Sequence, residues 1–329
     1  MSSPPIRLAL LVVAALSLAL AASAARPLAT VEQGRVRVGA VALPELPGLA
    51  LETVVGTEER WVAAATFADG FALFVGDGSG ARRLPAPPRA ASALRRELLP
   101  LLGDDGALAG LAWLEGTSAR RLAVRFARWD GTAWERTTTV SPPGAGSQLA
   151  LAATALADGR LLLAWSAFDG EDDEVLWSVW DGTTWTAPAP IAADNRVPDI
   201  TPALVAVEGG ALAAWATFDG TAYRVVASRF AAGQWSTPRP VAPSGTAFPT
   251  FEAATPAPLL LVRTALPRGW IVVEIGADGL PRRAAFAAAA GTERPVVEDA
   301  GGAVALDWPA HHLPRRLAPW TSVAPEADR

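Results

Sequence analysis

Short runs of alternating apolar and polar residues, separated by turn-forming pairs, occupy most of the chain. The clearest stretch covers residues 161–190, in which three apolar runs are separated by Asp169-Gly170 and Asp181-Gly182. Asp-Gly pairs between alternating runs are a strong local signal for β-hairpins. This stretch therefore predicts strand, turn, strand, turn and strand.

The same pattern repeats with a period near fifty residues. Trp113, Trp165 and Trp215 stand 52 and 50 residues apart. A second series, with spacings of 51 and 50, consists of Trp134, Trp185 and Trp235. A fixed period of this length, with about four short strands per unit, is typical of β-propeller blades. The sequence therefore predicts an all-β fold, a six-bladed β-propeller of four-stranded blades.

The predicted blades fill residues 25–329 as a single domain. Their approximate ranges are 49–88, 97–142, 149–192, 201–242, 251–286 and 295–323. The last unit lacks an outermost strand, and residues 35–43 resemble such a strand without the rest of its blade. We therefore expect N-terminal strand exchange to close the ring, which would hide two open sheet edges.

Up-and-down strands place the turns of each blade on two opposite faces. The turns between strands one and two and between strands three and four share one face, called here the turn-bearing face. The turns between strands two and three share the other face with the linkers between blades, and this is the linker-bearing face. We expect the ligand site on the linker-bearing face, near the axis.

The first 24 residues are typical of an export signal. Arg7 supplies a positive charge, residues 8–20 an apolar core, and residues 22–24 a small-residue cleavage site. An uncleaved anchor is the alternative, although the apolar run is shorter than the roughly 20 residues that a membrane-spanning helix needs. Abundant Ala, Arg, Gly and Pro without Lys is typical of a GC-rich bacterial genome. We predict a secreted or periplasmic bacterial protein with no membrane span after removal of the signal.

Composition excludes several kinds of chemistry. The chain has no Cys and no Lys, which excludes disulfides, thiolate sites and Schiff-base lysines. A net charge of −5 and scattered arginines give no support for nucleic-acid binding. The only histidines, His311 and His312, are adjacent, and the acidic run 169–174 lacks the spacing of a calcium loop. We therefore predict no metal and no cofactor.

The turn between the third and fourth predicted strands resembles a known repeat. Ser178, Gly182, Thr184 and Trp185 match the motif Ser-x-Asp-x-Gly-x-Thr-Trp, with Asp181 one position late. This motif is the Asp-box, or BNR repeat, of sialidase-like propellers, and the resemblance covers most of the chain as a repeat pattern. It implies the fold and says little about catalysis.

The resemblance also implies a set of site residues. Sialidases hold a carboxylate with three arginines and use a Tyr nucleophile with a Glu beside it and an Asp as acid/base. Here Arg196-Val197-Pro198 is similar to their Arg-Ile-Pro motif but stands in the middle of the chain, and Tyr223 is the sole tyrosine.

Position along the predicted blades suggests further candidates. The repeated tryptophans either pack between blades or form platforms for sugar rings. The candidate ligand-binding residues are Arg196, Arg263, Arg294, Trp165, Trp215 and Trp308. Glycoside cleavage requires two carboxyl groups roughly 5–10 Å apart. The candidate catalytic residues are Asp199, Glu252 and Tyr223.

The sequence thus favours an exported binding module that recognises a glycan or another extracellular ligand on the linker-bearing face. The absence of a recognisable catalytic set is the reason to favour binding over catalysis. One alternative is a divergent sialidase-like glycoside hydrolase. Another is a scaffold for protein partners, which would expose one broad apolar patch.

Overall fold

The computed structural model describes residues 29–32, 35–67, 70–88, 94–103, 105–142, 146–193, 196–252, 257–288, 294–308 and 313–323. Strands are the only regular elements in this part of the chain, so none of these residues forms a helix that could cross a membrane. The predicted signal segment 1–24 and both histidines lie outside the described residues.

The strands form a three-stranded N-terminal sheet and six further antiparallel sheets, numbered here in chain order. The N-terminal sheet contains β1 (Ala29–Glu32), β2 (Arg35–Val38) and β3 (Val41–Ala42). Sheet 1 contains β4 (Ala50–Gly56), β5 (Trp61–Phe67), β6 (Gly70–Asp77) and β7 (Gly80–Leu84). Sheet 2 contains β8 (Leu94–Leu102), β9 (Leu108–Gly116), β10 (Leu122–Arg128) and β11 (Thr138–Thr139). Sheet 3 contains β12 (Gln148–Ala155), β13 (Leu161–Phe168), β14 (Asp173–Trp180) and β15 (Ala189–Pro190).

The last three sheets depart from the simple four-stranded plan. Sheet 4 contains β16 (Asp199–Val207), β17 (Gly210–Phe218), β18 (Tyr223–Ala231), β19 (Gln234–Trp235) and β20 (Arg239–Pro240). Sheet 5 contains β21 (Thr246–Glu252), β22 (Leu259–Ala265), β23 (Arg268–Ile275), β24 (Pro281–Ala288) and the C-terminal β28 (Thr321–Ser322). Sheet 6 contains β25 (Val296–Asp299), β26 (Ala303–Trp308) and β27 (Leu313–Pro319).

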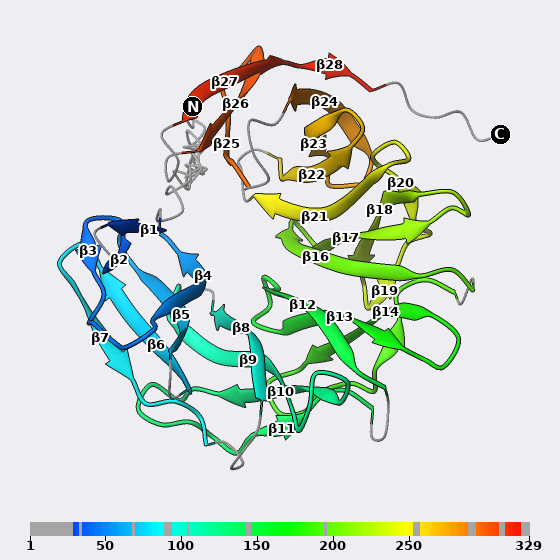
Figure 1. Ribbon diagram of the computed structural model, residues 1–329. Coiled ribbons are helices and arrows are strands. Elements are labelled where there is room, and N and C mark those ends of the chain that lie inside the picture. Colours follow the sequence, from blue (N-terminus) through cyan, green and yellow to red (C-terminus); the bar gives the residue numbers. More distant parts are fainter. Residues whose placement is uncertain are drawn as a thin grey trace, which may run out of the picture.

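Sheets 1 to 6 follow one another along an arc, with the first strand of each of these sheets nearest the centre (Figure 1). The inner strands β4, β8, β12, β16 and β21 contact one another in that order. This radial arrangement of antiparallel sheets is that of a β-propeller. The all-β prediction is confirmed, whereas the blade number of six stays a prediction, because the N-terminal sheet adds a seventh sheet and the described strands do not close a ring.

The N-terminal strands differ from the predicted strand exchange. Within residues 35–43, β2 pairs with β1 and β3, and not with sheet 6. Val36 and Val38 pack against Val54 and Trp61 of sheet 1. A hairpin between neighbouring segments costs less loop entropy than a pairing between the two ends of the chain, which is the physical reason for this correction.

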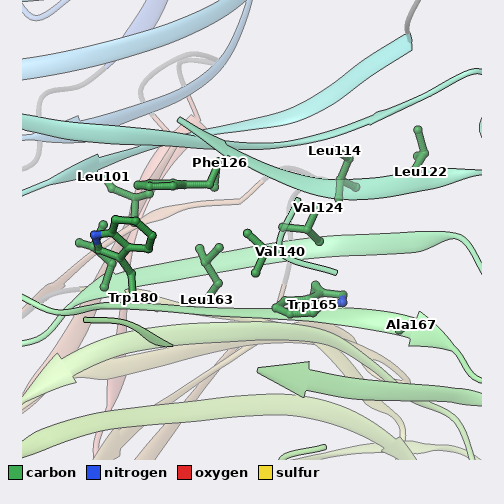
Figure 2. Close-up of a cluster of buried hydrophobic side chains, with 12 residues drawn as sticks. Leu101, Leu114, Leu122, Val124, Phe126, Val140, Leu163, Trp165, Ala167 and Trp180 are labelled. Carbon is green, nitrogen blue, oxygen red and sulfur yellow. The ribbon is translucent and has the colours of Figure 1, made fainter. Parts of the chain in front are cut away.

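Side chains between neighbouring sheets form the core. Figure 2 shows Leu101, Leu114 and Phe126 of sheet 2 facing Trp165 and Trp180 of sheet 3. Phe126 and Trp180 approach to 5.4 Å between ring centroids. The apolar residues of each second and third strand are thus buried between sheets, as the repeat pattern requires.

A β-bulge recurs in the first strand of sheets 1 to 5. The pairing register shifts there, and four bulge residues have left-handed φ angles, namely Glu97 (54°), Ala150 (52°), Thr201 (54°) and Phe248 (55°). The bulge leaves backbone N–H groups free to bond to the neighbouring sheet. Side-chain oxygens of the preceding sheet accept them, in the pairs Glu52 Oε2 with Leu98 N (3.1 Å), Glu97 Oε2 with Leu151 N (2.6 Å) and Ser166 Oγ with Thr201 N (3.0 Å).

Candidate ligand-binding grooves

The repeated tryptophans of the second strands lie in the core. Trp113, Trp165, Trp215 and Trp308 are 0, 0, 1 and 2 % exposed. They occupy β9, β13, β17 and β26, as the packing interpretation expects. Because their rings are covered by neighbouring strands, they present no face on which a sugar could stack in this structure.

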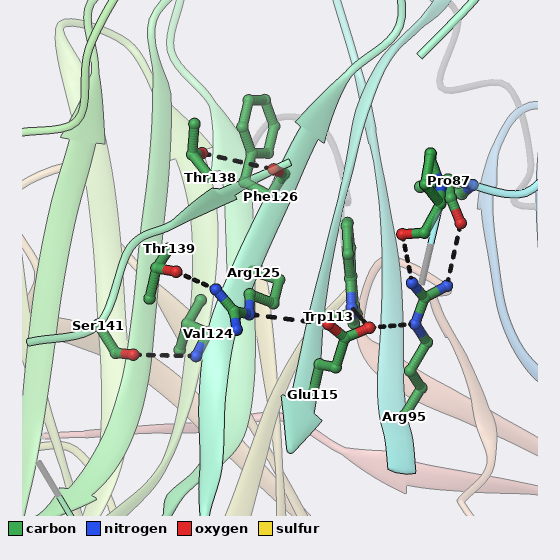
Figure 3. A network of polar contacts seen from close by, with 11 residues as sticks. Pro87, Arg95, Trp113, Glu115, Val124, Arg125, Phe126, Thr138, Thr139 and Ser141 are labelled. Atoms are coloured by element: carbon green, nitrogen blue, oxygen red, sulfur yellow. Dashed lines mark hydrogen bonds and ion pairs between the residues drawn. The ribbon is translucent and has the colours of Figure 1, made fainter. Parts of the chain in front are cut away.

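The indoles of Trp165 and Trp113 have polar partners in the core. Trp165 Nε1 donates to Gln148 Oε1 at 2.6 Å, and Trp113 Nε1 donates to Glu115 Oε2 at 3.3 Å. Glu115 also pairs with Arg95 and, at 3.8 Å, with Arg125 (Figure 3). A buried indole N–H and a buried carboxylate both need such partners.

Arg95 completes this buried network between sheets 1 and 2. Its guanidinium donates to the carbonyl oxygens of Pro87 (3.3 Å) and Pro88 (2.7 Å), which the linker supplies (Figure 3). The same group lies 4.9 Å from the Phe71 ring and 5.0 Å from the Trp113 ring. Since the Arg95 side chain is 5 % exposed and surrounded by partners, its role is structural.

The candidate arginines lie apart from one another. Arg294 forms an ion pair with Glu252, and Arg196 lies 3.8 Å from Glu171 on the surface. Arg263 is half-buried on β22, opposite Ala247 of β21. The structure therefore joins one predicted arginine to one predicted carboxylate without gathering the three arginines around a common point.

The two candidate catalytic carboxylates are also separated from each other. Asp199 is the first residue of β16 and is 2 % exposed, while Glu252 is the last residue of the adjacent inner strand β21. The two strands run in the same direction, so Asp199 lies at the starting end of the pair and Glu252 at the finishing end. The length of one strand, about 20 Å, therefore separates the two carboxyl groups. Tyr223 packs its ring against Phe218 at 5.5 Å between centroids, and Phe218 N donates to the carbonyl oxygen of Pro198 at 3.1 Å, so Tyr223 lies at the same end of sheet 4 as Asp199.

A groove of about 550 Å³ lies between sheets 1 and 2, and we call it the sheet 1–2 groove. The side chains in its wall include Glu59, Arg60, Asp77, Arg82 and Trp129. These residues come from the turns between strands one and two and between strands three and four, or from the strand ends next to these turns. The groove therefore opens on the turn-bearing face.

Local hydrogen bonds fix the walls of the sheet 1–2 groove. Asp77 accepts from the backbone N (2.8 Å) and the hydroxyl (2.6 Å) of Ser79 and from Gly80 N (3.2 Å). The hydrogen bond from the Ser79 side chain, followed by that from its backbone, lowers the pKa of the Asp77 carboxyl. Arg60 Nη1 donates to the carbonyl oxygen of Asp105 at 2.9 Å and so joins the two sheets.

A glycine next to this groove makes room for a buried indole on the face of sheet 1 that packs against the N-terminal sheet. Gly76 pairs across strands with Trp61, and a Cβ atom at Gly76 would lie 2.2 Å from Trp61 Cζ2. The indole therefore lies flat over a residue that must have no side chain. Trp129 closes the other wall, with its ring 4.9 Å from Trp134.

A second groove of about 580 Å³ lies between sheets 4 and 5, and we call it the sheet 4–5 groove. Arg229, Gln234, Trp235 and Ser236 line it on one side, and Asp278 on the other. Trp235 packs on Phe230 at 5.1 Å and reaches Trp177 of sheet 3 at 6.0 Å. This groove also opens on the turn-bearing face, because its walls come from the third-to-fourth-strand turns of both sheets.

Both grooves lie on the face opposite the one that the sequence favoured. The linkers of the linker-bearing face fall partly outside the described residues, so a site there stays a prediction. The sequence did not predict the grooves, because each groove is formed by residues of two blades. A repeat pattern does not indicate which residues of neighbouring blades meet. The available signal was the second tryptophan series, which includes Trp134 and Trp235 beside these turns.

No family model matches this chain, and no curated protein matches it in sequence. Among solved structures, a protein of unknown function from Dyadobacter fermentans DSM 18053 aligns with a TM-score of 0.53 and 12 % identity, over 84 % of this chain and 96 % of that chain. The polysaccharide lyase Uly1 aligns at 0.49 and 10 %, over 83 % and 78 %. A mutant of Aleuria aurantia lectin in complex with alpha-methyl-L-fucoside aligns at 0.46 and 14 %, over 81 % and 88 %. At these identities a likeness concerns the fold alone.

Proposed function

We propose that this protein is an exported glycan-binding module whose ligand sites are the sheet 1–2 and sheet 4–5 grooves. The observation that carries the proposal is the recurrence of one combination of groups on one face. Each groove has arginine and carboxylate side chains in its wall, and the sheet 1–2 groove also has Trp129, which is 8 % exposed. Sugars present a rim of hydroxyl groups, which such polar and charged side chains fit.

Two acids of the grooves, Asp77 and Asp278, suit binding better than cleavage. A glycosidase acid must be protonated near neutral pH and so needs a raised pKa, whereas the hydrogen bonds from Ser79 lower the pKa of Asp77. Asp278 is neutralised by Arg282, whose Nη2 lies 2.5 Å from its Oδ2. The sialidase-like hydrolase therefore remains the alternative that the geometry favours less.

The protein-scaffold alternative has one observation in its favour. Several large apolar side chains are exposed at strand ends or turns of the linker-bearing face, namely Leu149, Phe168, Phe248, Leu266 and Val296. They are distributed over sheets 3, 5 and 6, whereas the polar groups of each groove converge on one hollow. Convergence on a hollow is what favours a glycan over a protein partner.

A glycan array probed with the mature protein tests the proposal. We expect the protein to bind glycans, and Arg82→Ala or Gln234→Ala to weaken the affinity about tenfold. Each variant removes one hydrogen bond to the ligand, and the loss of one such bond corresponds to about this change in affinity. Arg128→Ala is the matched control, because Arg128 is exposed and pairs with Glu135 at 3.2 Å outside both grooves. Glycan binding that neither groove substitution changes would contradict the proposal. Release of free sugar from the same glycans would instead support the hydrolase.

A further inference from the structure

The two grooves differ in their balance of charge. In the sheet 1–2 groove two acids, Glu59 and Asp77, accompany two arginines, Arg60 and Arg82. In the sheet 4–5 groove the one acid, Asp278, already has Arg282 as its partner. Arg229 therefore adds a positive charge that no acid in the wall of this groove offsets.

A second arginine extends this positive charge along the boundary between the sheets. The sheet 4–5 groove shares Ser236 and Asp278 with a neighbouring hollow of about 380 Å³. Arg239 and Thr237 line that hollow on the side of sheet 4, and Gly279 on the side of sheet 5. Within the described part of the chain, neither Arg229 nor Arg239 forms a salt bridge.

The position of Arg229 is fixed from three sides. Its backbone N donates to Ser236 Oγ at 2.9 Å, and its Nη2 donates to the carbonyl oxygen of Glu208 at 3.2 Å. A Cβ atom at Gly209 would lie 3.4 Å from Arg229 Nη2, and one at Gly279 would lie 3.7 Å from its Cβ. Two glycine turns therefore enclose the side chain, and the guanidinium keeps further N–H donors for a ligand.

We propose that the sheet 4–5 groove and its adjoining hollow bind an acidic oligosaccharide, with Arg229 and Arg239 contacting anionic groups on different sugar units. This inference rests on the proposed function and adds the ligand class of one groove. A guanidinium recognises carboxylate and sulfate by the same paired N–H donors, so both kinds of acidic sugar fit. The charge-balanced sheet 1–2 groove has no such preference.

Calorimetric titration with three oligosaccharides of equal length tests the inference. The probes are an oligogalacturonate, a sulfated galactan oligomer and a neutral galactan oligomer. We expect either acidic oligomer to bind at least tenfold more tightly than the neutral one, and its affinity to fall as salt is added. The two acidic arms show whether carboxylate or sulfate is the preferred group.

Charge-neutral variants localise the effect. Arg229→Gln and Arg239→Gln should each weaken acidic binding about tenfold, as the loss of one charge-assisted contact implies. Arg315→Gln is the control, since Arg315 is exposed on sheet 6 and pairs with Glu298. Equal weakening by the control, or equal affinity for the neutral oligomer, would overturn the inference.

Failure of the inference can be told apart from failure of the proposed function. Neutral-glycan binding that Arg82→Ala reduces, with no response to Arg229→Gln, would remove the inference and leave the proposed function in place. Absence of binding to all three probes and to the array would overturn both. Thermal unfolding of each variant shows that it is folded before its affinity is compared.

Discussion

At the scale of single residues, several carboxylates stabilise turns and contacts between sheets by accepting backbone hydrogen bonds. Asp77, Asp130, Asp181 and Asp219 each accept backbone N–H groups from residues two and three positions ahead. Glu97 does the same across a boundary between sheets. The ionised acid is thus part of the local fold at these positions.

Glu97 gives a test of the contact between neighbouring sheets. Its two oxygens accept from Ala150 N (3.3 Å) and Leu151 N (2.6 Å), so Glu97→Ala leaves both amides without an acceptor. We expect the free energy of unfolding to fall by about 2 kcal/mol, measured by urea denaturation. Glu97→Gln keeps one acceptor and should cost less than half as much. Equal losses for the two variants would show that the hydrogen bonds are not the cause.

Asp181 gives a test by pH. Backbone hydrogen bonds from Thr184 and Thr183 and the Thr183 hydroxyl lower the pKa of its carboxyl to about 2. Because the folded-state pKa lies below the unfolded one, the stabilisation is present at neutral pH and is lost as pH falls from about 4 toward 2. Asp181→Asn should flatten the stability profile in this window, as measured by thermal unfolding at a series of pH values. An unchanged slope would contradict the assignment.

At the scale of elements, the β6–β7 hairpin of sheet 1 tolerates no side chain at one position. Gly76→Ala would bring a Cβ atom within 2.2 Å of the Trp61 ring. We expect a loss of about 2 kcal/mol in the free energy of unfolding, because the buried indole must move out of a well-packed site. The measurement is chemical denaturation followed by tryptophan fluorescence.

Gly78→Ala provides the control in the same hairpin. A Cβ atom at Gly78 meets no atom within 4 Å, and its φ angle is not left-handed. This variant should change the unfolding free energy by less than about 0.5 kcal/mol. Similar losses at both positions would mean that the turn, and not the contact with Trp61, sets the cost.

The strands could be predicted from the sequence, whereas the contacts between distant strands and between sheets could not. The spacing of Trp113, Trp165 and Trp215 and the Asp-Gly pairs predicted the strands of sheets 2 to 4, because both are properties of neighbouring residues. The pairing of β2 with β1 was missed, since a partial strand at one end fits either partner equally well by pattern. The grooves were missed because Arg229 and Asp278 are 49 residues apart in the sequence and meet only when two sheets pack.

At the scale of the whole molecule, contacts between neighbours hold the arc together. The C-terminal β28 pairs with β24 of sheet 5, although the residues before it belong to sheet 6. Arg283 Nη2 lies 2.6 Å from Glu274 and 2.5 Å from Asp299, and its guanidinium lies 4.3 Å from the Trp320 ring. Burial raises the pKa of the Asp299 carboxyl, but the hydrogen bonds from Trp320, Gly301 and Arg283 outweigh it and hold the pKa below its usual value. Arg283 and Glu274 of sheet 5, together with Asp299 and Trp320, therefore join sheets 5 and 6.

Removal of the C-terminal strand tests that joint. A chain that ends at Pro319 lacks Trp320 and β28, so sheet 6 loses part of its contact with sheet 5, while the ion pair of Arg283 with Asp299 remains. We expect amide hydrogens of β26 to exchange at least tenfold faster, with little change in sheets 2 to 4, because stability in such arrays passes between neighbours. Hydrogen exchange with mass spectrometry measures this.

A chain that ends at Val323 is the matched control, because it retains both Trp320 and β28. Its exchange rates should equal those of the full chain. Uniform acceleration across all sheets in the shorter variant would show that the molecule opens as one cooperative unit.

The recurring bulge has a consequence for how this architecture diversifies. Four of these positions hold a carboxylate, a methyl group, a hydroxyl and a phenyl ring in the same backbone conformation. The geometry therefore constrains the main chain and leaves the chemistry of the side chain open. Where the side chain makes no contact with the next sheet, unlike that of Glu97, substitution at such a site can change the surface of one sheet without a new fold.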